Sequence, residues 1–127
     1  MISEEEALYK ENILDHYRNP RNKGVLINPT HQRSAKNPLC GDQLTLFMNV
    51  DNDCIKKIAF QGRGCAISQA SMSLLTEHLQ GKTIHEAMQL TVDNIKDLLG
   101  ISVSFARQKC ANLSLQTLHG ALGGHNA

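Results

Sequence analysis

The four cysteines of this 127-residue chain are the residues that most directly suggest chemistry. Cys40, Cys65 and Cys110 each lie near the end of an expected element of secondary structure, where side chains from distant parts of the sequence can converge. Asp42 follows Cys40 by two residues, so on an extended segment both side chains point to the same side. Three thiolates and one carboxylate would form a four-coordinate site for Zn²⁺. These residues are therefore candidate metal ligands.

The same cysteines also allow a purely structural interpretation. The chain has no Cys-x-x-Cys pair and the gaps are long, so a zinc-finger or zinc-ribbon site is not indicated. Free cysteine is among the most buried residue types, and each thiol could simply fill the core. Cys54 fits this interpretation best, because it is expected on a strand face shared with Ile58 and Phe60. Glycines beside Cys40 and Cys65 favour the metal site, because they let backbone approach a metal or sulfide.

Composition and charge narrow the class of protein. The net charge of +1 and the absence of Trp do not suggest a nucleic-acid partner. The basic cluster of Arg18, Arg21 and Lys23 is interpreted as solvated surface, with a docking role as the alternative. No apolar run approaches the roughly 18 residues of a membrane span, so no membrane association is expected. The acidic start at 1–6 lacks the features of a secretion signal. We therefore expect a cytoplasmic protein, whose reduced thiols favour metal binding over disulfides.

A helix, a loop and a hairpin are expected in the first half of the chain. The helix ends near His16, and its apolar face is formed by Leu8, Ile13, Leu14 and Tyr17. Asn-Pro pairs make 28–38 a loop that could hold a short edge strand. Apolar residues then alternate over 44–50 and 54–60, and Asp-Asn-Asp at 51–53 provides turn chemistry.

Helical patterns fill the second half. Expected helices cover 67–79, 83–90 and 92–99, and a last helix begins after Ser104. The order of elements along the chain, a helix, a hairpin and then several helices, predicts an α+β fold. In this fold a small antiparallel sheet, made of the hairpin and the edge strand, is covered on one face by helices. We expect a single domain over 1–127.

Four motifs carry a resemblance to a known family. They read Asn-Pro-Leu-Cys-Gly-Asp at 37–42, Gly-Arg-Gly-Cys-Ala-Ile-Ser-Gln-Ala-Ser at 62–71, Arg-Gln-Lys-Cys-Ala-Asn-Leu at 107–113, and His-Tyr-Arg-Asn-Pro-Arg-Asn-Lys-Gly at 16–24. In this order they resemble the motifs of the IscU/SufU/NifU family of iron–sulfur cluster assembly proteins. The resemblance extends over 8–122, nearly the whole chain.

The resemblance implies a role in iron–sulfur cluster biogenesis. Family members receive sulfur as a persulfide from a cysteine desulfurase. They then build a transient cluster, expected to be [2Fe-2S], for delivery to apoproteins, or relay the sulfur to another scaffold. Zn²⁺ often occupies the same site in the resting form. The family's ligands correspond to Cys40, Asp42, Cys65 and Cys110.

The third motif supplies the residues expected to handle sulfur. Cys110 corresponds to the cysteine that is often assigned as persulfide acceptor in the family. Lys109 and Arg107 could stabilise its thiolate or pair with Asp42 when this carboxylate leaves the metal. Surface charge on a helix is the alternative interpretation of both cations.

Departures from the family pattern leave the branch open. Lys109 stands where scaffold-type members have His, and 102–109 lacks the prolines of the segment that engages a dedicated Hsp70 chaperone, so this partner is in doubt. The motif around Cys65 looks like that of SufU, a zinc-dependent sulfurtransferase partner of the desulfurase. The SufU insertion between Cys65 and Cys110 is absent. A scaffold or carrier role and sulfurtransferase activity are therefore both expected candidates.

Two further classes remain as alternatives. A structural zinc module would unfold when its metal is removed. A cysteine hydrolase would use Cys65 or Cys110 with a histidine, but none of the six histidines lies in a recognisable catalytic motif.

Overall fold

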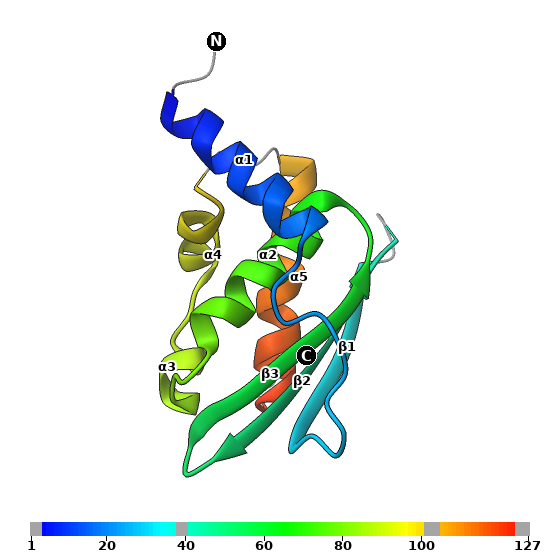
Figure 1. The fold of residues 1–127 in the computed structure, drawn as a ribbon, viewed down its shortest axis with the longest axis vertical. Helices are drawn as coiled ribbons and strands as arrows, with labels where there is room; N and C mark the ends of the chain where they lie inside the picture. The colour runs from blue at the N-terminus through cyan, green and yellow to red at the C-terminus, as the bar shows by residue number, and fades with distance from the viewer. Residues whose placement is uncertain (1–3, 38–40, 101–104, 124–127) are drawn as a thin grey trace.

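A computed structural model gives the fold of the chain (Figure 1). It describes residues 4–37, 41–100 and 105–123, with the side chains of 4–6 and 105–107 excepted. The elements are α1 (Glu4–Arg18), β1 (His31–Asn37), β2 (Asp42–Asp51), β3 (Cys54–Arg63), α2 (Ala66–Leu79), α3 (Ile84–Met88), α4 (Val92–Leu99) and α5 (Phe105–Ala121). None of the described helices is long and apolar enough to cross a membrane.

The three strands form one antiparallel sheet in the order β1-β2-β3. The predicted hairpin is confirmed. Its two-residue turn, Asn52-Asp53, has positive φ angles of 52° and 61°, as tight hairpin turns require. The edge strand expected within 28–38 is also present as β1, which pairs with β2 through Ala35 opposite Leu44.

A β-bulge changes one prediction for the hairpin. Lys56 is the extra residue of β3 where the pairing register shifts after Asn49. The bulge turns Ile55 to the core, where it is fully buried. The prediction that Cys54 shares a face with the later apolar residues of β3 is therefore wrong. Cys54 is half-buried instead and forms an isolated bridge with Thr83.

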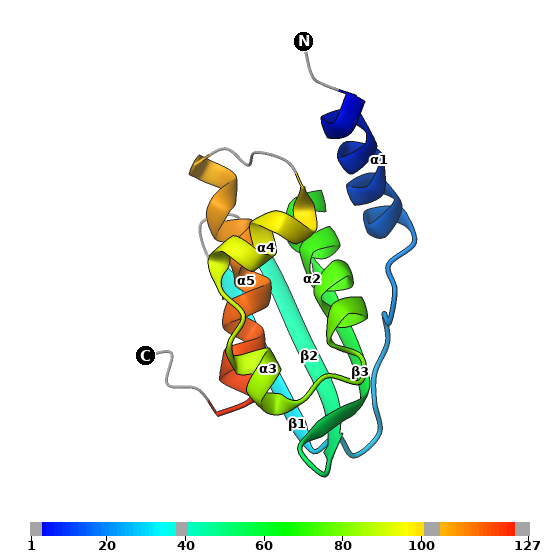
Figure 2. The same ribbon diagram turned by 90° about the vertical axis from the view of Figure 1, so that its left-hand side faces the viewer.

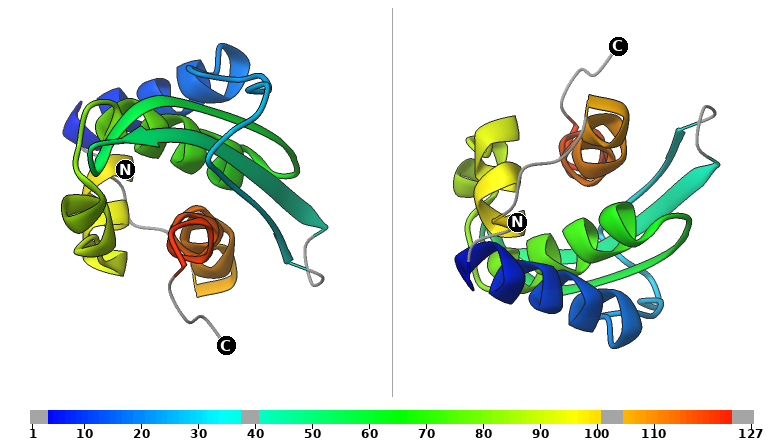
Figure 3. Two further views of the ribbon diagram at one scale, coloured as in Figure 1. Left: turned by 90° about the horizontal axis from the view of Figure 1, so that it is seen from below. Right: turned by 90° about the horizontal axis from the view of Figure 1, so that it is seen from above.

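Helices α2 and α5 lie side by side on one face of the sheet (Figure 2). Seen along the molecule, α5 lies in the concavity of the curved sheet (Figure 3). The inward side chains of β2, Leu44, Leu46 and Met48, are fully buried in the core beneath these helices. The α+β prediction, with helices on one face of a small sheet, is confirmed.

Local sequence signals set the starts of the two short helices and the end of α4 correctly, whereas α3 ends at Met88, two residues before its expected end. Thr83 caps α3 in a capping box with Glu86, and Thr91 caps α4 in the same way with Asn94. Gly100 ends α4 in the left-handed conformation with φ 72°, and its N–H donates to the carbonyl of Lys96. Ser104, expected at the start of the last helix, lies outside the described residues.

Helix α1 extends two residues beyond its predicted end, and Ile13 is the one residue of its predicted apolar face that is buried. Ile13 and His16 are 4% and 3% exposed, whereas Leu8 is 69% exposed. His16 Nδ1 lies 2.7 Å from Ser73 Oγ of α2, and the backbone N–H of Arg21 donates to the same oxygen. Burial lowers the pKa of His16, and the nearby positive charge of Arg21 lowers it further. Polar contacts thus replace the apolar face expected from spacing.

After α1 the chain runs along the free edge of β3. The N–H of Gly24 donates to the carbonyl of Phe60, and the N–H of Phe60 donates to the carbonyl of Asn22. This segment occupies hydrogen-bonding groups that an edge strand would otherwise expose. It then passes to the start of β1 (Figure 1).

Candidate metal centre

Residues from three elements meet at the end of the sheet where β2 begins and β3 ends. Asp42 is the first residue of β2, Cys65 directly precedes α2, and Cys110 lies in the second turn of α5. One ligand atom from each residue lies within 4.8 Å of the other two. Asp42 and Cys110 are fully buried, and Cys65 is half-buried. The structure therefore brings together two thiols and one carboxylate that are far apart in the sequence.

Asp42 is fixed by the backbone that leads into α2. The N–H of Cys65 donates to Asp42 Oδ1 over 2.8 Å, and Cys65 Sγ lies 3.7 Å from Asp42 Oδ2. A buried carboxylate needs such compensation, and the positive end of a helix dipole supplies more of it. Cys65 is the N-cap residue of α2, but its side chain makes no capping bond. The sulfur is thus directed to Asp42 instead of to the helix backbone.

Gly64 allows this close approach. Its φ is +138°, and a Cβ built on it would overlap Asp42 Oδ1 and lie 2.8 Å from Asp42 Cγ. No other residue type fits here without displacing the buried carboxylate. Gly62 is similarly confined, since its Cβ would lie 2.7 Å from the carbonyl oxygen of Gln43. The two glycines that precede Cys65 therefore make room for Asp42 and for the neighbouring strand.

Cys110 is positioned by a polar contact between α2 and α5. The hydroxyls of Ser71 and Ser114 lie 2.6 Å apart. Both lie within hydrogen-bond distance of the carbonyl oxygen of Ala111, at 2.9 and 3.0 Å. Because Ala111 directly follows Cys110, this contact fixes the turn of α5 that carries the thiol. All three partners are buried, which makes the contact costly to break.

The remaining predicted site residues are not all brought to this point. Cys40 and the side chain of Arg107 lie outside the described part of the structure. Lys109 is exposed on α5, one residue before Cys110. Cys54 is not in the described ligand group, and it is half-buried instead of filling the core as predicted. None of the three described cysteines forms a disulfide.

The sequence interpretation missed Gln69, a polar residue that lies one turn after Cys65. Gln69 is 5% exposed, and its Nε2 donates to Ser68 Oγ over 3.2 Å. Ser68 in turn donates to the carbonyl of Cys65. Within the described residues, Gln69 Oε1 has no hydrogen-bond partner. The only sequence signal was a polar side chain among the small and apolar residues that follow Cys65.

The chemistry of the donor set suits a thiophilic metal. Thiolate sulfur with one carboxylate oxygen is a ligand set that zinc accepts, and thiolates are the normal ligands of iron–sulfur clusters. A residue within the unassigned segment 38–40 would be needed to complete four coordination, and Cys40 is the candidate there. No histidine belongs to the described ligand group, and the acceptor nearest Cys65 Sγ is a carboxylate. The geometry therefore favours metal or sulfur chemistry over hydrolysis.

Comparison with known proteins places this geometry among relatives. The profile of the NifU-like N terminal domain family matches residues 8–127. The zinc-dependent sulfurtransferase SufU of Bacillus subtilis is 38% identical, over 89% of this chain and 88% of the relative. The iron-sulfur cluster assembly scaffold protein IscU of Aquifex aeolicus is 40% identical, over 90% of this chain and 73% of the relative.

A solved structure shows the same fold. The crystal structure of FiSufU from Fervidobacterium islandicum AW-1 superposes with a TM-score of 0.79 at 31% identity, covering 91% of this chain and 97% of the other. The relatives thus include proteins named as scaffolds and one named as a sulfurtransferase, all similar over most of their length to this chain.

Proposed function

Because the chain belongs to the family of NifU-like N-terminal domains, we propose that it acts in iron–sulfur cluster assembly in the cytoplasm, as a single domain. In this role it receives sulfur from a cysteine desulfurase and delivers a cluster or sulfur to other proteins. The observation that carries the proposal is the convergence of Asp42, Cys65 and Cys110 within 4.8 Å. Relatives named as scaffolds and as a sulfurtransferase support the same chemistry.

Zn²⁺ is the proposed resident metal. Asp42, Cys65 and Cys110 would hold it together with Cys40. Bound zinc would keep the thiols deprotonated and hold them together until sulfur arrives. The hydrogen bond from the N–H of Cys65 holds the Asp42 carboxylate in place at the same position. A [2Fe-2S] cluster would be the cargo of the same residues.

Asp42 is proposed as the ligand that makes release of this cargo easy. A carboxylate is a harder ligand than a thiolate and matches iron–sulfur chemistry less well. A cluster held by three cysteines and Asp42 is therefore bound less firmly than one held by four cysteines. A carrier that must give up its cargo benefits from this weakness.

Sulfur would enter as a persulfide. A thiolate of this chain attacks the outer sulfur of the desulfurase persulfide, the S–S bond breaks, and the desulfurase thiolate leaves, so no external oxidant or reductant is required. The family resemblance assigns this thiolate to Cys110. Cys110 is fully buried, so its reaction requires a rearrangement that exposes it. Lys109 is exposed next to Cys110 in the chain and would stabilise the Cys110 thiolate after this rearrangement. Arg107 is proposed for the same role.

The exposure of Cys65 gives a second candidate for the acceptor. Cys65 is half-buried, and it lies at the N-terminus of a 14-residue helix, which favours negative charge. Cys65→Ser and Cys110→Ser variants, treated with desulfurase and cysteine, separate the two by mass spectrometry of the persulfide. Loss of the persulfide only in Cys110→Ser supports Cys110, and loss only in Cys65→Ser transfers the role to Cys65.

The role as scaffold or sulfur relay is tested anaerobically. Cysteine desulfurase, cysteine and Fe²⁺ are added to the zinc-loaded protein, and visible absorbance and bound metal are followed. Displacement of zinc with a stable charge-transfer spectrum supports a scaffold. Retention of zinc with faster desulfurase turnover supports a zinc-dependent sulfurtransferase. If neither occurs and no persulfide forms, the proposed function is refuted.

A further inference from the structure

The sheet face that turns away from the helices carries mainly positive charges. Side-chain alternation places Lys36 of β1 and both Lys57 and Arg63 of β3 on this face. Lys23 reaches it from the segment along the edge of β3. All four side chains are exposed, and within the described part of the chain none is in an ion pair. We call these four residues the outer basic face.

Acidic residues are nearly absent from this side of the sheet. Asp51 is the only described acidic side chain whose strand position turns it to this side, and it lies at the hairpin turn, far from the metal centre. The chain as a whole has 13 Lys and Arg against 12 Asp and Glu. The outer basic face therefore results from where the fold places the charges, because the composition is nearly balanced.

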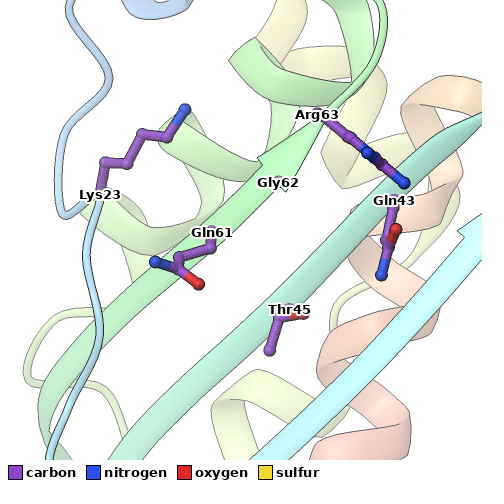
Figure 4. A pocket seen from close by; sticks show the side chains of 6 residues that line it. All are labelled: Lys23, Gln43, Thr45, Gln61, Gly62 and Arg63. Atoms are coloured by element: carbon purple, nitrogen blue, oxygen red, sulfur yellow. The ribbon is translucent and has the colours of Figure 1, made fainter.

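A hollow lined by hydrogen-bond donors lies between two of these cations (Figure 4). Its volume is about 340 Å³, and its lining residues are Lys23, Gln43, Thr45, Gln61, Gly62 and Arg63. Lys23 comes from the segment beside β3 and Arg63 from the end of β3, with Arg63 extending toward Gln43 and with Gln61 and Thr45 farther along the strands. Ammonium, guanidinium, amide N–H and hydroxyl groups are all donors that a carboxylate accepts.

The hollow adjoins the metal centre. Arg63 is two residues before Cys65, and Gln43 directly follows Asp42. The side chains of Gln43 and Asp42 point to opposite faces of β2, so the hollow and the metal centre lie on the two sides of one strand end. A molecule bound in the hollow would therefore be held at the border of the site where cargo is exchanged.

Exposed apolar residues in the same segment as Lys23 indicate a protein partner. Val25 and Ile27, which follow Lys23 in the same segment, are 56% and 87% exposed. Protein interfaces combine such apolar anchors with a charged rim. Nucleic acid fits less well, because Phe47, the aromatic residue whose position in β2 faces this side, is only 6% exposed and cannot stack on bases.

We propose that the outer basic face docks the acidic surface of an acceptor protein beside the metal centre. The inference rests on the proposed function for the identity of the partner as an acceptor. Carboxylates of the acceptor enter the hollow between Lys23 and Arg63, and an apolar patch of the acceptor covers Ile27. Charges at such a rim mainly accelerate association and make it dependent on salt.

The test uses an acidic apo-ferredoxin as acceptor and measures its binding to the zinc-loaded protein by biolayer interferometry at low and high salt. The face variant is Lys23→Glu/Arg63→Glu. The matched control is Lys10→Glu/Lys96→Glu, which makes the same change in charge at exposed positions on helices. We expect the face variant to bind at least tenfold more weakly at low salt and to lose most of its salt dependence. The control should retain most of the affinity.

Several results would overturn the proposal. One is equal affinity of the face and control variants for apo-ferredoxin. A second is that the parent protein shows no salt-dependent binding. A third is that the outer basic face binds phosphatidylserine vesicles or single-stranded DNA while the protein does not bind apo-ferredoxin. Ile27→Ser, which changes no charge, should also weaken binding. Zinc content is measured in every variant. A parent protein that binds apo-ferredoxin but holds no metal would contradict the proposed function and leave the docking surface supported.

Discussion

Replacement of Gly64 by alanine tests whether the metal centre depends on close approach of the backbone to Asp42. The added methyl group would overlap Asp42 Oδ1 and lie 2.8 Å from its Cγ, so the fully buried carboxylate must move. A non-glycine residue at a φ of +138° is also strained, by about 1–3 kcal/mol. Loss of the hydrogen bond from the N–H of Cys65 to the carboxylate adds about 1.5–3 kcal/mol. The expected total is about 3–6 kcal/mol.

Gly41→Ala is the matched control. Gly41 also has a positive φ, 70°, but nothing lies within 4 Å of its Cβ position. This variant should lose only the cost of the left-handed conformation, about 1–2 kcal/mol. Urea unfolding of the metal-free proteins measures both values, and the midpoint for Gly64→Ala should be lower than that for Gly41→Ala by about 1 M or more.

Zinc affinity provides the second readout of the same pair. Displacement of Asp42 should weaken zinc binding by Gly64→Ala at least tenfold, as loss of groups that orient ligands typically does. Competition with a chromophoric chelator measures this. Equal unfolding midpoints and equal zinc affinities for Gly64→Ala and Gly41→Ala would refute the argument that Gly64 makes room for the carboxylate.

Four further outcomes are expected. Because burial holds the pKa of His16 below 6.5, its contribution to stability is fully present above about pH 6.5 and is lost as pH falls toward the folded pKa. The loss of stability between about pH 7.5 and pH 5.5 should therefore be smaller in His16→Gln than in the parent protein, but unchanged in the exposed control His85→Gln. An equal reduction in both variants would contradict this. Ser71→Ala should cost about 1–2 kcal/mol in urea unfolding and weaken zinc binding through Cys110, whereas unchanged affinity would show that the contact does not position the thiol. Removal of zinc with a chelator should lower the melting temperature but leave the far-UV circular dichroism of a folded protein, because the apolar core is built from side chains of the sheet and several helices; unfolding would favour a structural zinc module. Asp42→Ala should retain a reconstituted cluster longer and transfer it more slowly, and equal transfer rates would refute the role of the carboxylate in release.

Part of the outer basic face was visible in the sequence but could not be interpreted there. The sequence favours solvated surface over a docking role for the cluster at 18–23. The structure separates its members, since Arg21 pairs with Asp15 at 2.6 Å whereas Lys23 faces the sheet. Lys36 lies on β1, and both Lys57 and Arg63 lie on β3, so only the pairing register brings the cations of the two strands to one face. Charge patterns that depend on strand pairing have no local signal in the sequence.

The sequence by itself determined the elements and the candidate ligands. Period-two alternation identified the hairpin, capping residues such as Thr83 and Thr91 set helix starts, and the motif around Cys65 indicated the family. These signals are local, because backbone propensity and capping act over a few residues. The tertiary structure alone decided that α1 buries His16, which depends on the hydroxyl of Ser73, 57 residues away. It also decided that the bulge at Lys56 turns Cys54 from the core, and that Gly64 approaches Asp42 closely enough to fix the metal centre, because each depends on contacts between distant segments.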